Sequence, residues 1–303
     1  LGTTTTALRL YDLATGHALA TCADWTALAP YGADVITRIQ YTIDHQDGLT
    51  RLSSLLRQQL KALLTRALSQ AGRQPAELKR TVTAGNTVMQ SLLAGVSVRP
   101  LAAAPFCPET FFRQSSGLTL LDAPLYCVPC AAGFVGGDIT AGALVSMIWN
   151  KPEFNLFIDL GTNGEIVFGN SDFMMSCACS AGPAFEGGDI SCGMRATDGA
   201  IEACSIDAKT MEPTLHIVGN EGQKPVGLCG SGIIDVIAEL FRCGIISPKG
   251  KFIREGDRVR HDHYGIGSYV LAFKEEAAGH KDVEINEVDI DNFIRAKGAI
   301  FSA

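Results

Sequence analysis

The sequence has no cluster of basic residues and no long apolar run, and we expect no signal peptide. Its 25 Lys and Arg stand against 32 Asp and Glu, a net charge of −7 that disfavours a nucleic-acid partner. No run approaches the roughly 18 to 20 uncharged residues needed to cross a bilayer. We therefore expect a cytoplasmic protein that binds neither nucleic acid nor a membrane.

The cysteine spacing does not resemble a disulfide framework, although ten cysteines are present. Cys127 and Cys130 form a CxxC and Cys177 and Cys179 form a CxC, so a metal or cluster site has to be considered. Apolar neighbours surround both pairs and no His lies nearby. The sequence therefore favours reduced, buried thiols over a metal site.

Two common nucleotide-binding signatures are also missing, because the sequence contains neither GxxxxGK[ST] nor a Rossmann fingerprint. A short repeat is present instead. LGTTTT at residues 1–6 and LGTNGE at residues 160–165 agree at three of six positions with an offset of 159 residues, and a strand pattern follows each copy. We predict a duplication with a first lobe at residues 1–150 and a second lobe at residues 151–303.

Such a turn is suited to binding phosphate. Glycine lets the backbone approach an anion, while amide N–H groups and hydroxyls point at the phosphate oxygens. Asp159, directly before the second turn, is predicted to hold Mg²⁺ through water; the first copy lacks this Asp because the chain starts one residue too late. The alternative is that both turns only open hairpins. The predicted phosphate-binding residues are Gly2, Thr3, Thr4, Thr5, Gly161, Thr162, Asn163 and Gly164.

The remaining pattern alternates strands and helices. The predicted strands are Ala7–Leu13 and Ala18–Cys22, which form a hairpin, then a buried Leu78–Thr83, Asn155–Asp159 and Thr214–Val218. The predicted helices are Leu52–Leu68, one that starts at Asn86 and Thr87, Ile139–Trp149, Ser231–Cys243 and Ile290–Phe301. The last helix should bury Ile290, Phe293, Ile294, Lys297 and Ile300 in one stripe.

Three further features each allow two interpretations. Glu165 could orient or deprotonate the attacking water, or be a strand-edge carboxylate. Asp138 is predicted as a helix N-cap, with a position in a ligand cleft as the alternative. Gly230 and Ser231 open a helix and could bind an anion there, or Ser231 could simply cap that helix.

Several segments together resemble the C-terminal ATP-binding domain of one family, the ATP-dependent reductive activators of corrinoid proteins. These segments are YGADVITRI at 31–39, TAGNTVM at 83–89, APF at 104–106, AGFVGGD at 132–138, IDLGTNGE at 158–165, AGPAFEG at 181–187, GLCGSG at 227–232 and AKGAI at 296–300. The resemblance implies an α/β fold of the actin, Hsp70 and sugar kinase type, in which two ribonuclease H-like lobes enclose an ATP cleft. It also implies that the chain is incomplete at both ends, stopping before the adenosine-binding turn.

The resemblance further implies an ATPase that drives reduction of a corrinoid protein from Co(II) to Co(I). The electron would come from a [2Fe–2S] domain upstream, whose CxxxxCxxC spacing is missing from this sequence. The implied partner is a corrinoid protein or a corrinoid-dependent methyltransferase, and the implied assembly is a homodimer. Two alternatives stay open: a small-molecule kinase of the same superfamily, and a nucleotide-regulated binding module without turnover.

Overall fold

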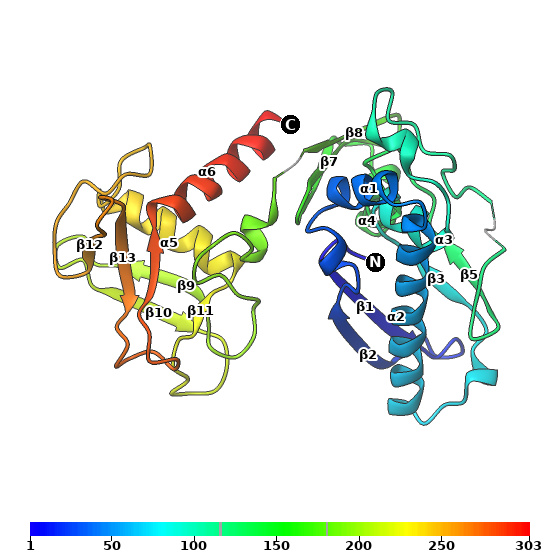
Figure 1. Cartoon of the computed structure of the whole chain (residues 1–303), viewed down its shortest axis with the longest axis horizontal. Helices are drawn as coiled ribbons and strands as arrows, with labels where there is room; N and C mark the ends of the chain where they lie inside the picture. The colour runs from blue at the N-terminus through cyan, green and yellow to red at the C-terminus, as the bar shows by residue number, and fades with distance from the viewer. Residues whose placement is uncertain (115–116, 180) are drawn as a thin grey trace. The chain divides into compact units, whose positions relative to one another are not determined.

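The computed structural model describes residues 1–114, 117–179 and 181–303. Contacts divide them into two units, one of Leu1–Asp159 with Glu165–Ala178 and one of Leu160–Gly164 with Cys179–Ala303 (Figure 1). Both units combine helices with sheets, as an α/β fold requires. Short 3₁₀ helices connect several elements: η1 (Ala29–Tyr31), η2 (Pro75–Glu77), η3 (Arg99–Ala102), η4 (Ile148–Asn150) and η5 (Pro183–Glu186).

A hairpin on a long helix opens the first unit. β1 (Thr5–Tyr11) pairs antiparallel with β2 (Ala18–Trp25), and both contact α2 (Gly48–Gln70). The predicted hairpin is confirmed, although β1 begins two residues earlier and ends before Leu13, which is exposed. The helical periodicity is confirmed as well, because the apolar positions of α2 are buried. α1 (Val35–Asp44) starts with a capping box between Asp34 and Thr37.

The next sheet has the order β3-β5-β4, formed by β3 (Thr81–Thr83), β4 (Thr119–Leu120) and β5 (Ala123–Cys127). β3 runs parallel to β5. The predicted buried strand Leu78–Thr83 is wrong in length and in burial: β3 has three residues, and the side chain of Val82 is 58% exposed. The preceding Pro75 starts η2, so the chain turns before the strand begins.

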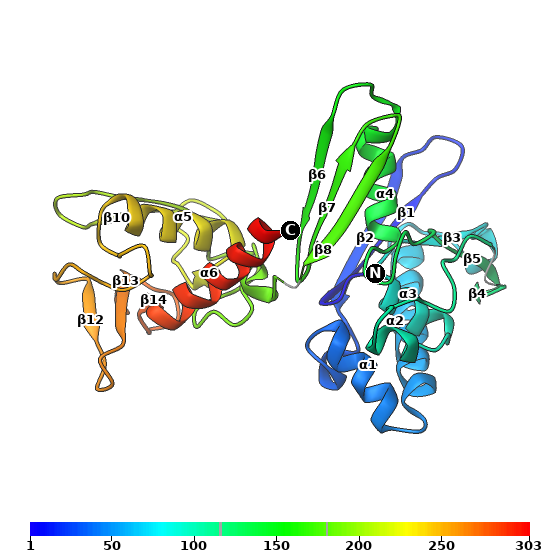
Figure 2. The same cartoon turned by 90° about the horizontal axis from the view of Figure 1, so that it is seen from above.

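Two helices and a third sheet complete this unit. α3 (Thr87–Ala94) starts at the predicted place, with Asn86 as its N-cap. α4 (Gly137–Ser146) is shorter than the predicted Ile139–Trp149, because Met147 takes a left-handed conformation and ends it. Figure 2 shows α4 beside the sheet β6-β7-β8, formed by β6 (Asn155–Leu160), β7 (Gly164–Gly169) and β8 (Met174–Cys179).

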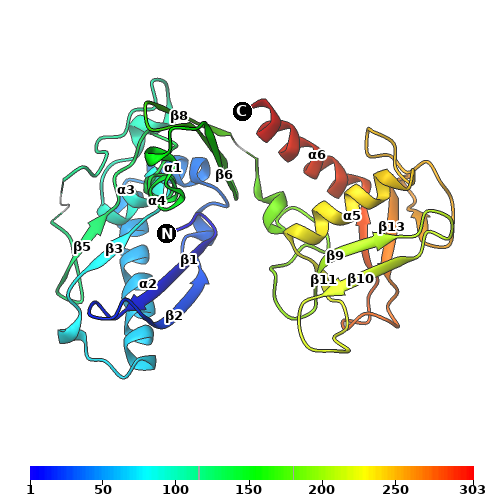
Figure 3. The ribbon, with the colours of Figure 1, turned by 180° about the vertical axis from the view of Figure 1, so that it is seen from behind.

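Among its described residues, the second unit contains two small sheets and the two helices α5 and α6 (Figure 3). The first sheet has the order β10-β9-β11, from β9 (Ala200–Ile206), β10 (Pro213–Ile217) and β11 (Gly227–Leu228). The second is β12-β13-β14, from β12 (Val259–His261), β13 (Gly267–Ala272) and β14 (Val283–Asn286). α6 (Glu287–Ser302) buries Ile290 and Phe293 as predicted, but Lys297 is exposed and Ala296 lies in the core instead.

α5 (Gly230–Arg242) packs closely on β9. A Cβ on Gly232 would collide with the carbonyl oxygen of Ile201, so only glycine permits this approach. Further along, α5 satisfies main-chain donors of the strand: Cys204 donates its N–H to Asp235 at 3.1 Å, and Ile206 donates to Glu239 at 2.8 Å. The hydrogen bond from Arg242 and the N–H of Ile206 hold the pKa of Glu239 at about 2.

Within the described residues, no helix combines the length and the apolar character that crossing a bilayer requires.

Candidate functional site

Three carboxylates from three elements interact inside the first unit. Asp138 lies in the first turn of α4, Asp159 near the end of β6 and Glu165 near the start of β7. Burial raises the pKa of Glu165 to about 8, and the charges of Asp138 and Asp159 add to this effect. Burial also raises the pKa of Asp138; the N–H of Ile139 opposes the shift and Asp159 reinforces it. Glu165 is therefore mainly protonated at neutral pH.

Close-packed glycines bring the start of the chain to these carboxylates. A Cβ on Gly85 would collide with the carbonyl oxygen of Leu1, and a Cβ on Gly136 would lie 2.7 Å from Oδ1 of Asp138. Gly137 donates its N–H to the carbonyl of Gly85 at 2.9 Å. The glycines at residues 85, 136 and 137 therefore let three segments meet beside the carboxylate of Asp138.

Asn86 adds an amide to the same region. Its Oδ1 accepts the N–H groups of Val88 at 2.8 Å and Met89 at 3.3 Å, as expected of an N-cap. Its Nδ2 is buried and has no hydrogen-bond partner among the described residues. The α-carbon of Asn86 lies 2.6 Å from the place a Cβ on Gly136 would take, so this unused donor belongs to the neighbourhood of Asp138.

The first predicted phosphate turn is compact. The N–H of Gly2 bonds the carbonyl of Thr5 at 2.9 Å. Thr3 is buried, while Thr4 and Thr5 are half-buried. The main-chain nitrogen of Leu1 bonds the carbonyl of Ala84 at 2.7 Å. The structure thus places the predicted residues Gly2 to Thr5 in the same unit as the three carboxylates.

The second predicted turn connects β6 to β7. The N–H of Gly161 bonds the carbonyl of Asn163 at 3.0 Å, and Thr162 is buried. Gly164 has a packing role that the sequence did not reveal, because a Cβ there would lie 2.7 Å from Sγ of Cys179 and 3.0 Å from Ile300. The contact units assign residues 160–164 to the second unit. Phosphate binding by this turn stays a prediction.

The predicted N-cap at Asp138 is wrong, and so is the cap that was left open as the alternative for Ser231. Asp138 is the second residue of α4, whose N-cap is Gly136, so the carboxylate is left for other interactions. Ser231 is likewise the second residue of α5, whose N-cap is Cys229. Its exposed hydroxyl lies 3.3 Å from Sγ of Cys229. Anion binding by Gly230 and Ser231 at this helix start stays a prediction.

The donor set at Asp138 and Asp159 suits a hard cation such as Mg²⁺. Among residues 1–114, 117–179 and 181–303, no three His, Cys, Asp or Glu side chains are arranged to hold a metal ion by themselves. Mg²⁺ keeps several waters and needs only one or two carboxylates, so the two Asp side chains fit it chemically. Both CxxC thiols are buried, and burial raises the pKa of Cys127 to about 11.

Comparisons with known proteins cover almost the whole chain. Residues 1–151 match the family model for the RACo middle region, and residues 153–303 match the model for the C-terminal domain of RACo, the ASKHA domain. The chain belongs to the family of reductive activators of corrinoid proteins. The resemblance read from the motifs is confirmed, and the ASKHA domain supports an actin-like α/β fold.

Relatives of this activator family show the same similarity along the chain. The corrinoid activation enzyme RamQ of Eubacterium limosum is 33% identical over 100% of this chain and 52% of its own length. The [Co(II) methylated amine-specific corrinoid protein] reductase of Methanosarcina barkeri is 25% identical, over 100% of this chain and 57% of its own. A solved reductive activator for corrinoid, iron-sulfur protein superposes with a TM-score of 0.89 at 40% identity, covering 100% of this chain and 49% of that one. The chain thus spans about half the length of these relatives.

Proposed function

We propose that this chain binds and hydrolyses ATP in the reductive activation of a corrinoid protein. The match of both halves of the chain to reductive activators is the observation that carries this proposal. The ASKHA domain supports nucleotide binding. The carboxylates of Asp138, Asp159 and Glu165 supply a site where a metal-bound triphosphate would meet acid and base groups.

In this proposal the turns at Gly2–Thr5 and Gly161–Gly164 hold phosphate oxygens through backbone N–H groups and hydroxyls. Asp159, with Asp138 beside it, would hold Mg²⁺ through water, and the positive charge of the ion would be available to the phosphates. A bound cation favours the ionised form of Glu165, whose pKa is raised to about 8 without it. Glu165 then orients the attacking water and accepts its proton.

Hydrolysis is coupled to the partner through conformation. Bound ATP stabilises one conformation of the protein, and this stabilisation is lost when the ATP is hydrolysed. About 1.4 kcal/mol of preferential binding to one redox state shifts a one-electron potential by about 59 mV. Ordinary binding energies are therefore large enough to make the one-electron reduction of Co(II) to Co(I) feasible.

The other participants are proposed from the family. A [2Fe–2S] centre in an upstream domain would supply the electron that reduces the Co(II) of the corrinoid substrate to Co(I). The acceptor is a corrinoid protein or a corrinoid-dependent methyltransferase, and the activator acts as a cytoplasmic homodimer. The relatives named as corrinoid activators and as a corrinoid protein reductase support this partner class.

The test is ATP-dependent reduction of a purified corrinoid protein, followed through the loss of Co(II) absorbance. We expect the full-length protein to support reduction and its Asp159→Asn variant to fail. Asp172→Asn, at an exposed aspartate on the loop before β8, is the matched control and should reduce normally. Phosphate transfer to a metabolite would instead favour a kinase, and nucleotide binding without turnover would favour a binding module. Normal reduction by Asp159→Asn would remove the proposed role of this carboxylate.

A further inference from the structure

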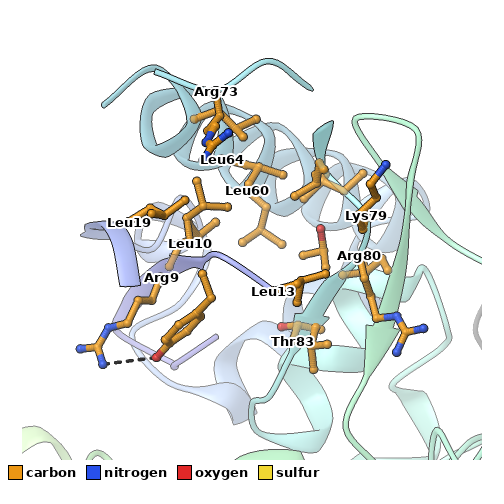
Figure 4. Close-up of a pocket in the computed structure, with 18 of the residues that line it drawn as sticks. Arg9, Leu10, Leu13, Leu19, Leu60, Leu64, Arg73, Lys79, Arg80 and Thr83 are labelled. Carbon is orange, nitrogen blue, oxygen red and sulfur yellow. Dashed lines mark hydrogen bonds between the residues drawn. The ribbon is translucent and has the colours of Figure 1, made fainter. Parts of the chain in front are cut away.

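Six consecutive residues without a charged, hydroxyl or amide side chain are exposed at residues 102–107. Their sequence is AAAPFC, and it begins with the last residue of η3. Runs of more than three or four exposed apolar residues are avoided unless they serve a function. These six do not line the cavity of about 640 Å³ between β1 and β3, into which Leu10 and Leu60 point (Figure 4). The 102–107 segment is thus an apolar surface rather than the wall of that cavity.

Phe106 in this segment combines a strained backbone with an exposed ring. Its φ is +55°, in the left-handed region that bulky side chains rarely adopt. Phe112 has nearly the same φ, +56°, but its side chain is only 3% exposed and packs with Cys127 and Cys130, so packing offsets the strain there. The side chain of Phe106 is 44% exposed, so contacts within the described chain offset its strain less completely. Strain of this kind is typical of segments that bind a ligand or a partner.

Three contacts hold Phe106 in this position. Its N–H bonds the carbonyl of Ala103 at 2.9 Å. Its ring meets the ring of Phe134 edge to face, with the centroids 5.7 Å apart. Its carbonyl oxygen packs on Gly133 so closely that a Cβ on Gly133 would collide with it. The exposed ring is therefore held in one place, as expected of an aromatic anchor in a protein interface.

The stretch of chain that supports Phe106 continues to the carboxylate of Asp138. Gly133 lies in it, and Asp138 follows five residues later. Thr87, the first residue of α3, donates its hydroxyl to the carbonyl of Ala132 at 2.7 Å. Residues 132–138 thus contact the 102–107 segment at one end and supply a carboxylate of the proposed ATPase at the other. A displacement of Asp138 when nucleotide binds or is hydrolysed would reach Phe106 through this one stretch.

We propose that the 102–107 segment is a docking surface for the corrinoid protein, with the ring of Phe106 as its anchor. The proposal rests on the proposed function, because it takes a corrinoid protein as the partner. Residues 100–108 carry no charge, so the surface suits an apolar patch of a protein and offers no cation to the phosphates of a nucleotide. Rigid aromatic side chains in such patches contribute a large share of protein–protein affinity.

The connection to Asp138 favours the corrinoid protein over a second copy of this chain as the occupant. In the proposed function the nucleotide changes how strongly the partner is bound, so the surface that meets the partner has to be connected to the nucleotide site. A permanent contact between two copies would instead hold the 102–107 segment fixed through the cycle. The relatives named as a corrinoid protein reductase and as a reductive activator for corrinoid, iron-sulfur protein have a protein partner of this kind in their names.

The first test is a footprint at Cys107, which is exposed and directly follows Phe106. The full-length protein is treated with iodoacetamide, and mass spectrometry measures the rate at which Cys107 is alkylated. With the purified Co(II) corrinoid protein at about ten times its Kd, roughly nine-tenths of the sites are covered, so this rate should fall about tenfold. Serum albumin at the same concentration is the control and should leave the rate unchanged.

Variants at Phe106 separate docking from packing. Phe106→Asn removes the ring and introduces a residue that tolerates the left-handed backbone. Its affinity for the corrinoid protein, measured by isothermal titration calorimetry, should fall by about tenfold or more, while its melting temperature stays close to that of the parent. Phe106→Tyr keeps the ring and should bind as the parent does. Tyr264→Asn removes an exposed aromatic residue from the turn between β12 and β13, and as the matched control it should also bind normally.

The outcomes distinguish failure of this surface from failure of the proposed function. Normal binding by Phe106→Asn or an unchanged alkylation rate, with a parent protein that supports ATP-dependent reduction, would overturn the surface and leave the function standing. A parent that neither binds nor reduces the corrinoid protein would remove both. Alkylation of Cys107 that slows with rising protein concentration, without the corrinoid protein, would assign the segment to a second copy and overturn the proposal.

Discussion

Glu165 on β7 and Asp138 on α4 share one buried region, where the charge of Asp138 disfavours ionisation of Glu165. Burial and Asp138, with a further contribution from Asp159, keep Glu165 protonated at neutral pH. Asp138 is itself ionised less readily than an exposed aspartate. The two residues lie 27 positions apart, and only the folded chain brings them together. This coupling makes the region sensitive to pH and to added cations.

The first prediction concerns stability against pH. The pKa of Glu165 is an ordinary 4.5 in the unfolded chain and about 8 in the folded protein. Between pH 4.5 and pH 8 the native state therefore holds a proton on this side chain that the unfolded state has lost. The stability contributed by the protonated side chain is full below pH 4.5 and is lost as the pH rises through 8. Glu165→Gln should remove this loss and be more stable than the parent at pH 9 by about 1 kcal/mol or more. Urea unfolding at several pH values measures it.

Glu153→Gln, at an exposed glutamate, is the matched control and should keep the slope of the parent. A parent protein whose stability does not fall between pH 5 and pH 9 relative to Glu165→Gln would contradict the assignment.

The second prediction tests whether the charge of Asp138, in addition to burial, raises the pKa of Glu165. Asp138→Asn removes a nearby negative charge while keeping the shape of the side chain, so the pKa of Glu165 should fall below about 8. Carbon-detected NMR of the glutamate carboxyl groups over a pH series reports it directly. Addition of Mg²⁺ to the parent should lower the same pKa. An unchanged titration of Glu165 in Asp138→Asn would show that the two carboxyls do not interact.

A third prediction tests the glycine contacts. Gly85→Ala places a Cβ against the carbonyl of Leu1 and should destabilise the protein by about 1 to 3 kcal/mol. Gly298→Ala is the matched control: Gly298 lies in α6, a Cβ there meets nothing within 4 Å, and the better helix propensity of Ala should stabilise by up to about 1 kcal/mol. Thermal unfolding compares the two. Similar melting temperatures for both variants would contradict the close approach of Gly85 to Leu1.

Cysteine reactivity provides a fourth prediction. Burial raises the pKa of Cys127 to about 11 and that of Cys204 to about 12, and the thiolate is the reactive form. Cys107 is exposed. With iodoacetamide at pH 8, Cys107 should be alkylated first, and Cys127 and Cys204 should react only when the protein is unfolded. Mass spectrometry of peptides from a time course measures the order, and early modification of Cys127 would contradict its burial.

Local patterns predicted much of the fold. The leucine periodicity of α2, the first hairpin and the Asn86 cap all follow from interactions within a short stretch of chain, and the structure confirms them. The prediction failed where the length of an element is not determined by its own local sequence pattern. β3 is short because its length depends on β5 and on the preceding proline turn, and α4 ends early at Met147, a residue type that gives no stop signal.

The candidate site was only partly predictable. Asp159 and Glu165 follow from their place beside a glycine turn. Asp138 was assigned to a cap because an Asp before an apolar helix has that role often, and the helix start differs by only two residues from the predicted one. The preceding pair Gly136-Gly137 was the available signal, because two glycines permit a close approach. The raised pKa of Glu165 depends on three elements at once, which no single window of sequence contains.

The carboxylates that α5 places against β9 affect how another chain could pair with this strand. Asp235 and Glu239 accept the N–H groups of Cys204 and Ile206, the donors through which a foreign strand would add to this sheet. Any chain that approached would have to displace two side chains that extend from the same helix. Beyond the two residues of β9 that pair with β11, this side of the strand is therefore covered by side chains of α5 rather than by another strand, which disfavours strand exchange at these two donors.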